Sequence, residues 1–343
     1  MLGLASGLRL RFDTAMHRHA FLGLLALVPL SASFAEEPSA PFTLPHYELL
    51  PLPDSQVAFL HDGVEQTRWH FDAKYPRPFF YPFNGPSGTS LTRMGHPGAP
   101  DHDHHRSIWF ANAKIDGIDF WSDNTKARIR QKHWQTHTDG DKEAIMTSQL
   151  GWFDESGTER LEQDLVAASF ADKEGGAFLE FQITLRPAKG REKVDLDKNN
   201  FGFLAVRVAK SLSHRFGGGQ LENSDGLKGE PAIFGKSAAW MDYSGPIATG
   251  TEAEHHAVVE GITFYDHPEN PRYPTPWHVR SDGWMGAALC LNEGHTISEG
   301  SPLVLRYLLH AHSGGCDHDR ATRIADLFSK RPGFGEKGLR VER

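Results

Sequence analysis

Apolar and polar residues alternate through the middle of the chain. Within residues 177–187, Leu179, Phe181, Ile183 and Leu185 are separated by single polar residues. A period of two is typical of a β-strand that buries one face and exposes the other. This stretch is therefore predicted to be a half-buried strand.

Similar stretches make the predicted fold class mainly β. Residues 144–153, 158–170 and 177–187 are joined by the short turns DESG and ADKEGG, which predicts an antiparallel meander. Residues 36–58 are expected to pack along the sheets as a leader strand. Further strands are expected at 202–209, 237–245, 258–266, 286–292 and 302–312. This number of strands favours a large antiparallel β-sandwich over alternating strands and helices.

One helix is predicted near the C-terminus, over residues 317–333. Asp317 or Asp319 can cap its first turn, and the pair Pro332-Gly333 ends it.

Polar residues also recur on one face of the strand expected at 302–312, and that face is expected to look at water.

The N-terminal residues 1–35 have the pattern of a secretory signal peptide. Basic residues precede the apolar run FLGLLALVPLSASFA, and Ser33 and Ala35 form a small-x-small cleavage pair. The run is too short for a transmembrane helix, and no second long apolar segment follows. We expect a periplasmic or secreted protein with no membrane span after cleavage, in which residues 36–343 form a single β-sandwich domain.

The charge and cysteine counts narrow the classes of function. The chain of 343 residues carries 36 Lys and Arg against 44 Asp and Glu, so a generic nucleic-acid or anionic-membrane binder is not expected. Cys290 and Cys316 are its two cysteines. In an oxidising compartment they are compatible with one disulfide, or with one buried and one surface thiol.

The most distinctive motif, GHPGAPDHDHHRSIWF at residues 95–110, holds four histidines. In an extended segment, His102 and His104 leave the same face and His105 leaves the other. Two imidazoles at this spacing can share one divalent ion, but a third ligand is needed. A metal site, catalytic or sugar-binding histidines without metal, and a hydrated polar loop are the three interpretations.

A second polar segment, YDHPENPRYPTPWHVR, covers residues 265–280. Its four prolines forbid a continuous helix or central strand, which predicts a stiff loop. Such loops often carry function, although prolines also brace long connections while a tryptophan fills the core. The candidate residues on it are Asp266, His267, Asn270, Arg272, Trp277, His278 and Arg280.

These motifs resemble a bacterial family of unknown function that is often labelled "methane oxygenase PmoA-like". The matching stretches are residues 75–93, 101–111, 118–121, 266–280 and 305–314. Asp103 and Ser107 stand where the family usually has Pro and Gly in His-Pro-His-His-Arg-Gly. The resemblance implies a β-sandwich of the kind seen in sugar mutarotases and polysaccharide lyases, and a role in bacterial glycan catabolism.

The leading hypothesis is an exported carbohydrate-active enzyme that cleaves or modifies a glycoside or an oxidised sugar. A lyase, a hydrolase and a sugar epimerase all fit histidine acid–base chemistry. The candidate catalytic residues are His104, His105, Arg106, Asp266 and His278. The candidate substrate-binding residues are Arg272, Trp277, Arg280, Asn270 and Trp109.

Two other functions remain open at this point. One is a glycan-binding module that uses the same groove without a reaction. The other is a copper or zinc oxygenase, as the family label suggests, with His102, His104 and His267 as ligands. The expected cofactor is accordingly none or one divalent metal ion, and the expected partner is a sugar or oligosaccharide. No phosphate-binding loop or nucleophile elbow is present, so nucleotide cofactors are not supported.

Overall fold

A computed structural model describes residues 43–96, 102–251, 254–335 and 338–341. Leu44–Arg343 form one compact unit. The predicted signal peptide lies outside the described residues.

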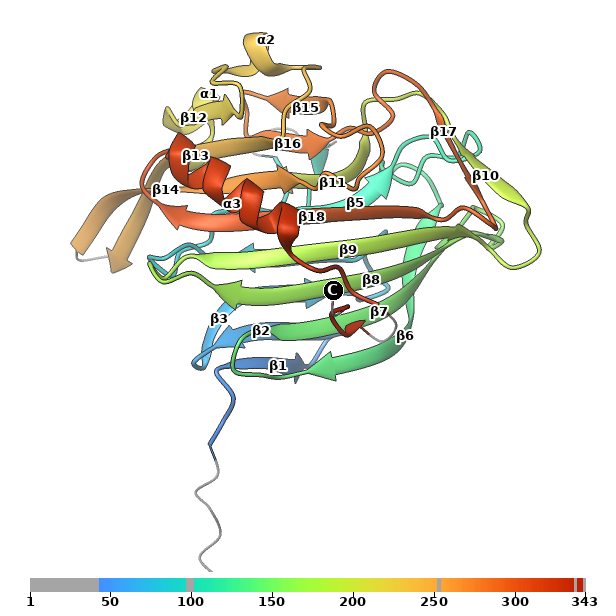
Figure 1. Cartoon of the computed structure of the whole chain (residues 1–343), viewed down its shortest axis with the longest axis horizontal. Coiled ribbons are helices and arrows are strands. Elements are labelled where there is room, and N and C mark those ends of the chain that lie inside the picture. Colours follow the sequence, from blue (N-terminus) through green and yellow to red (C-terminus); the bar gives the residue numbers. More distant parts are fainter. Residues whose placement is uncertain (1–42, 97–101, 252–253, 336–337, 342–343) are drawn as a thin grey trace, which may run out of the picture. The chain divides into compact units, whose positions relative to one another are not determined.

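The first sheet contains eight strands, and every neighbouring pair is antiparallel (Figure 1). In spatial order they are β1 (Tyr47–Leu52), β2 (Gln56–His61), β3 (Val64–His70), β4 (Phe79–Phe83), β5 (Ile108–Asn112), β11 (Gly202–Arg207), β16 (Trp284–Ala287) and β15 (Trp277–Arg280). The expected leader strand is instead the hairpin β1–β2, because Asp54 and Ser55 adopt φ angles of 60° and 57° and turn the chain back.

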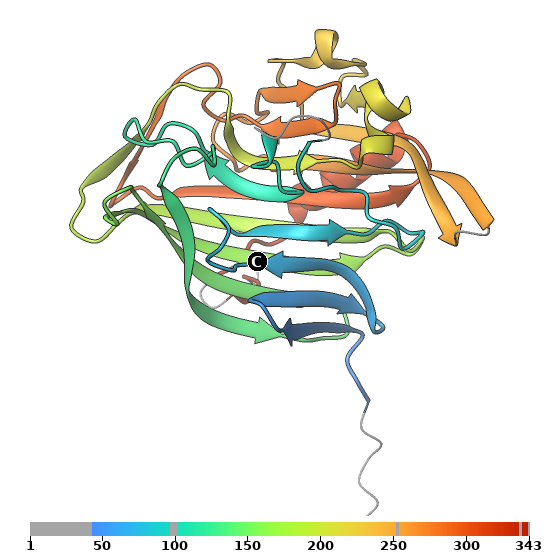
Figure 2. The ribbon, with the colours of Figure 1, turned by 180° about the vertical axis from the view of Figure 1, so that it is seen from behind.

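The second sheet also has eight antiparallel strands, and Figure 2 shows the first sheet in front of it. Its order is β12 (Gln220–Asn223), β13 (Trp240–Thr251), β14 (Glu254–Asp266), β18 (Leu303–Ser313), β9 (Ala177–Pro187), β8 (Glu159–Ala171), β7 (Ala144–Phe153) and β6 (Arg128–Thr138). The predicted meander is confirmed as β7–β8–β9. Smaller elements are the pair β10 (Lys193–Leu196) and β17 (His295–Ser298), the 3-10 turn η2 (Lys210–Leu212), and the short helices α1 (His214–Gly217) and α2 (Glu230–Ile233).

The two large sheets share one apolar core. Phe80 of β4 meets Phe181 of β9 edge to face, with ring centroids 5.4 Å apart. Ile108 and Leu204 of the first sheet line the same apolar space as Ile183 of β9. Burial of large aromatic and aliphatic side chains from both sheets is the main stabilising force of such a sandwich. The predicted mainly β, antiparallel fold with a C-terminal helix is confirmed.

The C-terminal helix α3 (His318–Lys330) lies on the outer face of the second sheet (Figure 1). Its buried residues Ala321 and Phe328 pack with Trp240, Tyr265 and Leu308 of the sheet. The sequence predicted that the polar face of β18 looks at water. That prediction is wrong, because this packing leaves Arg306, His310 and His312 each at most 2% exposed.

Of the two caps that the sequence allowed, Asp317 is the N-cap of α3, and its carboxylate accepts a hydrogen bond from the Arg320 amide at 2.9 Å. We expect Asp317→Ala to lower the free energy of unfolding by about 1 kcal/mol, since the first-turn amide loses its acceptor. Urea unfolding measures this. Asp319→Ala, which removes a first-turn charge but keeps the cap, is the control and is expected to cost less. Equal losses for both variants would contradict a capping role for Asp317.

Two further sequence expectations concern the cysteines and the membrane. Cys290 is buried and Cys316 is half-buried, and both are free thiols, so the possible disulfide is not formed. Within the described part of the chain, no helix is long and apolar enough to cross a membrane.

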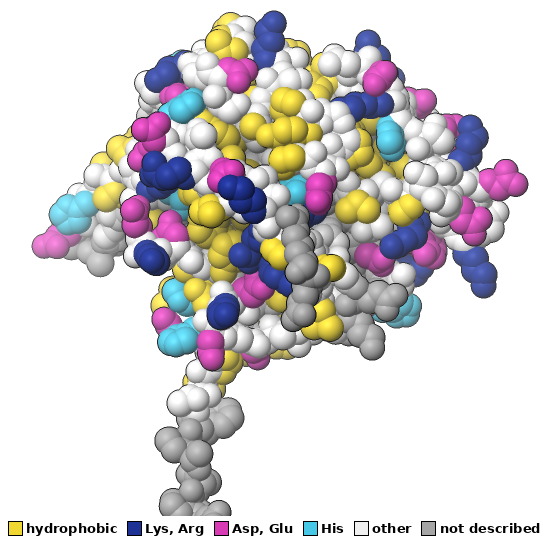
Figure 3. Space-filling model, in the orientation of Figure 1, with side chains coloured by type: hydrophobic (Ala, Val, Ile, Leu, Met, Phe, Trp, Pro, Cys, Tyr) yellow, Lys and Arg dark blue, Asp and Glu magenta, His cyan; other side chains and the backbone are white. Residues whose placement is uncertain are grey.

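On the face that carries α3, basic and acidic side chains are interspersed (Figure 3).

Candidate functional site

Three neighbouring strands of the first sheet place polar side chains on one face. Arg207 of β11 pairs directly with Trp284 of β16, and Trp284 pairs with Arg280 of β15. Directly paired residues in antiparallel strands project to the same face, as do residues two apart in one strand. Arg207, Trp284, Arg280 and His278 therefore stand side by side on the face opposite to the one that carries Met285.

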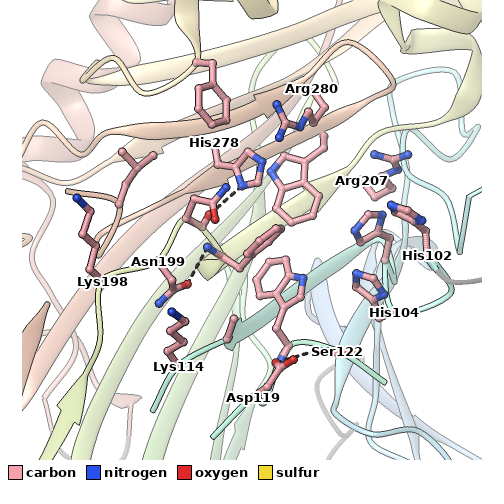
Figure 4. Close-up of a pocket in the computed structure, with 18 of the residues that line it drawn as sticks. His102, His104, Lys114, Asp119, Ser122, Lys198, Asn199, Arg207, His278 and Arg280 are labelled. Atoms are coloured by element: carbon pink, nitrogen blue, oxygen red, sulfur yellow. Dashed lines mark hydrogen bonds between the residues drawn. The ribbon is translucent and has the colours of Figure 1, made fainter. Parts of the chain in front are cut away.

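These side chains form one wall of a cleft of about 1190 Å³ (Figure 4). His102, His104 and His105, from the loop before β5, line the same cleft. The two polar segments that the sequence singled out are more than 150 positions apart in the chain and meet here. Only part of each segment reaches the cleft, however.

Aromatic rings form the middle of the cleft. The indoles of Trp121 and Trp284 are 5.1 Å apart by ring centroid, and Phe201 lies 5.7 Å from Trp121. Trp109 is 1% exposed and packs against both indoles. Its ring centroid is 5.2 Å from that of Trp121 and 5.5 Å from that of Trp284. Trp109 is therefore placed to support the rings that a ligand would meet, and does not itself line the cleft. Flat apolar rings with polar edges are suited to stacking against a sugar ring.

His278 is held in one neutral tautomer. Its Nδ1 lies 2.8 Å from the carbonyl oxygen of Asn200, which only accepts, so Nδ1 carries the proton and donates it. Burial lowers the pKa of His278 to about 4. At neutral pH its Nε2 therefore carries a lone pair, and no described residue is hydrogen-bonded to that atom.

The three histidines of the loop are in mutual contact. The ring of His105 is 4.3 Å from His104 and 5.0 Å from His102, both edge to face. Burial, together with the neighbouring charges of His104 and Arg207, lowers the pKa of His105 far below its ordinary value. His105 is therefore neutral at physiological pH and is unsuited to donate a proton. The half-buried His104 is the better candidate for an acid.

Ser107 anchors the end of this loop. Its φ is 56°, in the left-handed region, where glycine is least strained. This is one of the two positions at which the chain departs from the family motif. The side chain compensates through a hydrogen bond of 2.7 Å from Ser107 Oγ to Thr92 Oγ1, and the Ser107 amide donates to the Arg93 carbonyl. The loop geometry is thus held without the glycine.

Arg207 is the main site residue that sequence reasoning missed. Its NH1 donates to Asp282 Oδ1 at 2.9 Å, and Asp282 Oδ2 lies 3.1 Å from His96 Nε2. Burial alone would raise the pKa of Asp282, but the hydrogen bond and charge of Arg207 and the contact with His96 hold it below its usual range. One signal was available in the sequence, because Arg207 is the only charged residue of the apolar stretch GFLAVRVA, residues 202–209, which was predicted to be a strand.

The cleft has a second group of residues that no motif indicated. They come from the loops after β5 and before β11, and they include Lys114, Lys198 and Asn199. In Figure 4 the two lysines lie on the opposite side of the aromatic rings from His102 and His104. Neither lysine has an ion-pair partner among the residues that the structure describes.

Arg106 lies outside the cleft lining. Its two terminal nitrogens contact the Asp123 carboxylate at 3.1 and 2.6 Å, and its guanidinium lies over the Tyr75 ring. Asp123 also pairs with the buried Arg77 at 3.1 Å. Arg106 is thus committed to a structural ion pair, so its expected catalytic role does not fit its position.

Three candidates from the proline-rich segment are buried away from the cleft. Asp266 accepts hydrogen bonds from Asn270 Nδ2 at 2.7 Å and from the Thr275 amide at 2.8 Å. Burial raises the pKa of Asp266 to about 7. Asn270 also bonds both backbone groups of Arg306, and Trp277 is fully buried, with Nε1 donating to the Ala238 carbonyl. These residues fix the segment to the sheet, and none of them lines the cleft.

Arg272 and His267 are also placed elsewhere. Arg272 donates to the carbonyl oxygens of Leu289, Glu293 and Gly294, at 2.6 to 3.1 Å. His267 is fully buried against α3, with Nε2 3.2 Å from the Phe328 carbonyl. Among the candidates from this segment, only His278 and Arg280 line the cleft.

The expected metal ligands do not come together. His102 and His104 line the cleft, but His267 lies under α3 and does not. Over the described ranges, no group of three or more His, Cys, Asp or Glu side chains is arranged to hold a metal ion. The triad His102, His104 and His267 therefore does not fit a metal, and no step of the proposed chemistry uses one.

The fold and the site define a two-sheet β-sandwich protein with an aromatic, histidine-lined cleft on one sheet. The chain belongs to the family described as "Family of unknown function (DUF6807)", whose model matches residues 56–326. No curated protein matches the chain.

Proposed function

We propose that the protein is an exported carbohydrate-active enzyme that cleaves or modifies a glycoside or an oxidised sugar by histidine acid–base chemistry. One observation carries the proposal: the indoles of Trp121 and Trp284 line one cleft together with the imidazoles of His278, His102 and His104, and Trp284 is in ring contact with both His278 and His105. Export rests on the signal-peptide pattern. The resemblance to the PmoA-like family, with its mutarotase- and lyase-type sandwich, supports a sugar substrate.

The cleft supports binding of a sugar through its middle. Stacking of a sugar ring on the indoles of Trp121 and Trp284 buries apolar C–H groups and leaves the hydroxyls at the polar edges. Asn199 and Ser122 are polar groups on the lining that can meet such hydroxyls. A volume of about 1190 Å³ has room for more than one sugar unit, so an oligosaccharide is included in the proposed substrate class.

The proposed base is His278 and the proposed acid is His104. With Nδ1–H bonded to Asn200, the free lone pair of His278 is on Nε2, the atom that would take a proton from the substrate. A series of ring contacts connects His278 to His104. The ring centroids are 4.9 Å apart for His278 and Trp284, 4.8 Å for Trp284 and His105, and 4.3 Å for His105 and His104. His104 is half-buried and lines the cleft, so its ring can reach a bound ligand.

A panel of glycans and 3-keto-glycosides tests the proposal on the full mature chain, with product detection and binding measured in parallel. We expect product from at least one member, and we expect His104→Gln to retain binding while turnover falls about 100-fold, the loss typical of one acid–base group. The control is His133→Gln, on the edge strand β6, which is expected to keep full turnover. Binding without product for every member would favour the glycan-binding module, and neither binding nor product would overturn the proposal.

A further inference from the structure

We infer that the cleft takes an acidic sugar, whose carboxylate is held by Arg207 through the edge of the guanidinium that carries Nε and NH2. This inference rests on the proposed function and specifies its substrate class. Three arginines were candidate site residues in the sequence: Arg106, Arg272 and Arg280. The structure commits two of these to structural contacts and places Arg207 at the cleft instead.

The hydrogen bonds of Arg207 divide its guanidinium into a used side and an unused side. NH1 donates to Asp282 at 2.9 Å. Nε and NH2 are buried, and neither has a hydrogen-bond partner among the described residues. Buried donors in native proteins are almost always paired, and leaving charged donors unpaired is costly. A residue that is 0% exposed, lines the cleft and keeps two such donors is therefore suited to an anionic ligand.

The unused side has the geometry that fits a carboxylate. Nε–H and one N–H of NH2 are parallel in the planar fork, so they match the two oxygens of one carboxylate. The chain itself shows this pairing elsewhere, where Arg68 contacts Glu65 with Nε–Oε1 at 3.0 Å and NH2–Oε2 at 2.6 Å. Arg207 offers the same pair of atoms at the cleft.

Two more donors of the lining favour an acceptor-rich ligand. The indole nitrogens of Trp121 and Trp284 are buried and have no partner among the described residues. An indole N–H only donates, so these groups are satisfied by oxygen acceptors and by no donor. Trp284 is also the direct cross-strand neighbour of Arg207. Carboxylate and hydroxyl oxygens of an acidic sugar supply acceptors to all three side chains.

The remaining charges of the cleft agree with this assignment. Asp282 is neutralised by Arg207 and by contact with His96, and Arg280 is paired with Glu230 at 3.0 Å. Lys114 and Lys198, which no described carboxylate pairs with, add positive charge across the aromatic rings (Figure 4). The unpaired positive charge of these two lysines favours a negatively charged ligand over a neutral one.

The first test changes the ligand and leaves the protein intact. Calorimetry compares oligosaccharides of galacturonic, glucuronic and mannuronic acid with the same oligosaccharides after their carboxyl groups are reduced to alcohols. We expect at least one acid to bind about 10- to 100-fold more tightly than its reduced form, the range for hydrogen bonds to a charged group. Equal binding of acid and alcohol would overturn the inference and leave the proposed function standing. Binding of no carbohydrate at all would overturn both.

The second test assigns the contact to Arg207. Arg207→Lys keeps a positive charge beside Asp282 but loses the two parallel donors, so the preference for acid over alcohol is expected to fall about tenfold or more. Arg68→Lys is the matched control, because it removes the same pair of parallel donors at a position outside the cleft lining, and its preference is expected to stay. An oligosaccharide of neutral sugars that carries sulfate groups is measured as a further ligand. Tighter binding of the sulfate than of every uronate, or an unchanged preference in Arg207→Lys, would overturn the assignment.

Discussion

A His267→Gln variant is expected to gain stability relative to the wild-type protein by about 3 kcal/mol as the pH falls from 7 to 4. His267 was a candidate metal ligand in the sequence. The structure buries it fully, with Nδ1 accepting from the Glu269 amide at 3.1 Å and Nε2 facing the Phe328 carbonyl at 3.2 Å. Because Nδ1 accepts only when it carries no proton, the bond from the Glu269 amide requires the neutral ring.

The sign of this change in stability follows from proton uptake by His267 in the folded and unfolded states. Burial, assisted by the charge of Arg306, lowers the pKa of His267 to about 4, whereas an exposed histidine in the unfolded chain titrates near 6.5. Between these values the unfolded state binds the proton and the folded state does not. The wild-type protein therefore loses about 1.4 kcal/mol per pH unit from this group as the pH falls, and the variant does not.

Urea unfolding of both proteins at steps from pH 7 to pH 4 measures this effect. Every other titrating group is common to the two proteins, so the difference between their free energies of unfolding isolates His267. His256→Gln, at an exposed position of β14, controls for the exchange of histidine for glutamine itself. Parallel wild-type and His267→Gln curves would contradict a neutral, buried His267.

The sequence predicted strands best where they are long and regular. β7, β8 and β9 keep an uninterrupted antiparallel register over most of their length, so their period of two is visible in the chain. Apart from the expected leader strand, the strands before residue 140 were missed, and for several of them the reason is identifiable. β2, β3 and β6 contain shifts of register, and each shift breaks the alternation from which a strand is recognised.

The candidate site could be predicted only where chemistry is concentrated in the sequence. The run of histidines at 102–105 and the segment ending in His278 and Arg280 both stand out and both reach the cleft. Which residues of each segment face the cleft depends on strand pairing, and that is a property of the folded sheet. Arg207 and Trp284 meet because β11 and β16 are neighbours, although 76 residues separate them in the chain.

Because the direction of a side chain depends on the folded structure, some residues that the sequence assigned to the site lie elsewhere. Asp266, Asn270 and Trp277 are polar or aromatic residues in a proline-rich segment, which is also the composition of a brace. Their partners, such as the backbone of Arg306 and the carbonyl of Ala238, lie more than 30 residues away along the chain. Only the folded structure shows that these partners already use the polar groups.

His278→Asn is expected to lower kcat by about 100- to 10,000-fold on the substrate found with the panel, while KM changes little. The asparagine amide can replace the Nδ1–H bond to the Asn200 carbonyl, so the variant removes the Nε2 lone pair and keeps the local hydrogen bond. Because the pKa of His278 is lowered to about 4, kcat/KM of the wild-type protein is expected to fall as the pH drops through that value. The residual activity of the variant is expected to lack this acid limb.

His214→Asn is the matched control, since His214 Nδ1 also bonds a backbone carbonyl, that of Gly219 at 3.0 Å, and does not line the cleft. It is expected to keep kcat, KM and the acid limb. A structural role for His278 would lower thermal stability and activity together and leave the shape of the pH profile unchanged. A proton-transfer role removes the acid limb at unchanged melting temperature. An unaltered kcat in a folded His278→Asn protein would show that the base is another group of the cleft, because the atom proposed to accept the proton is then absent.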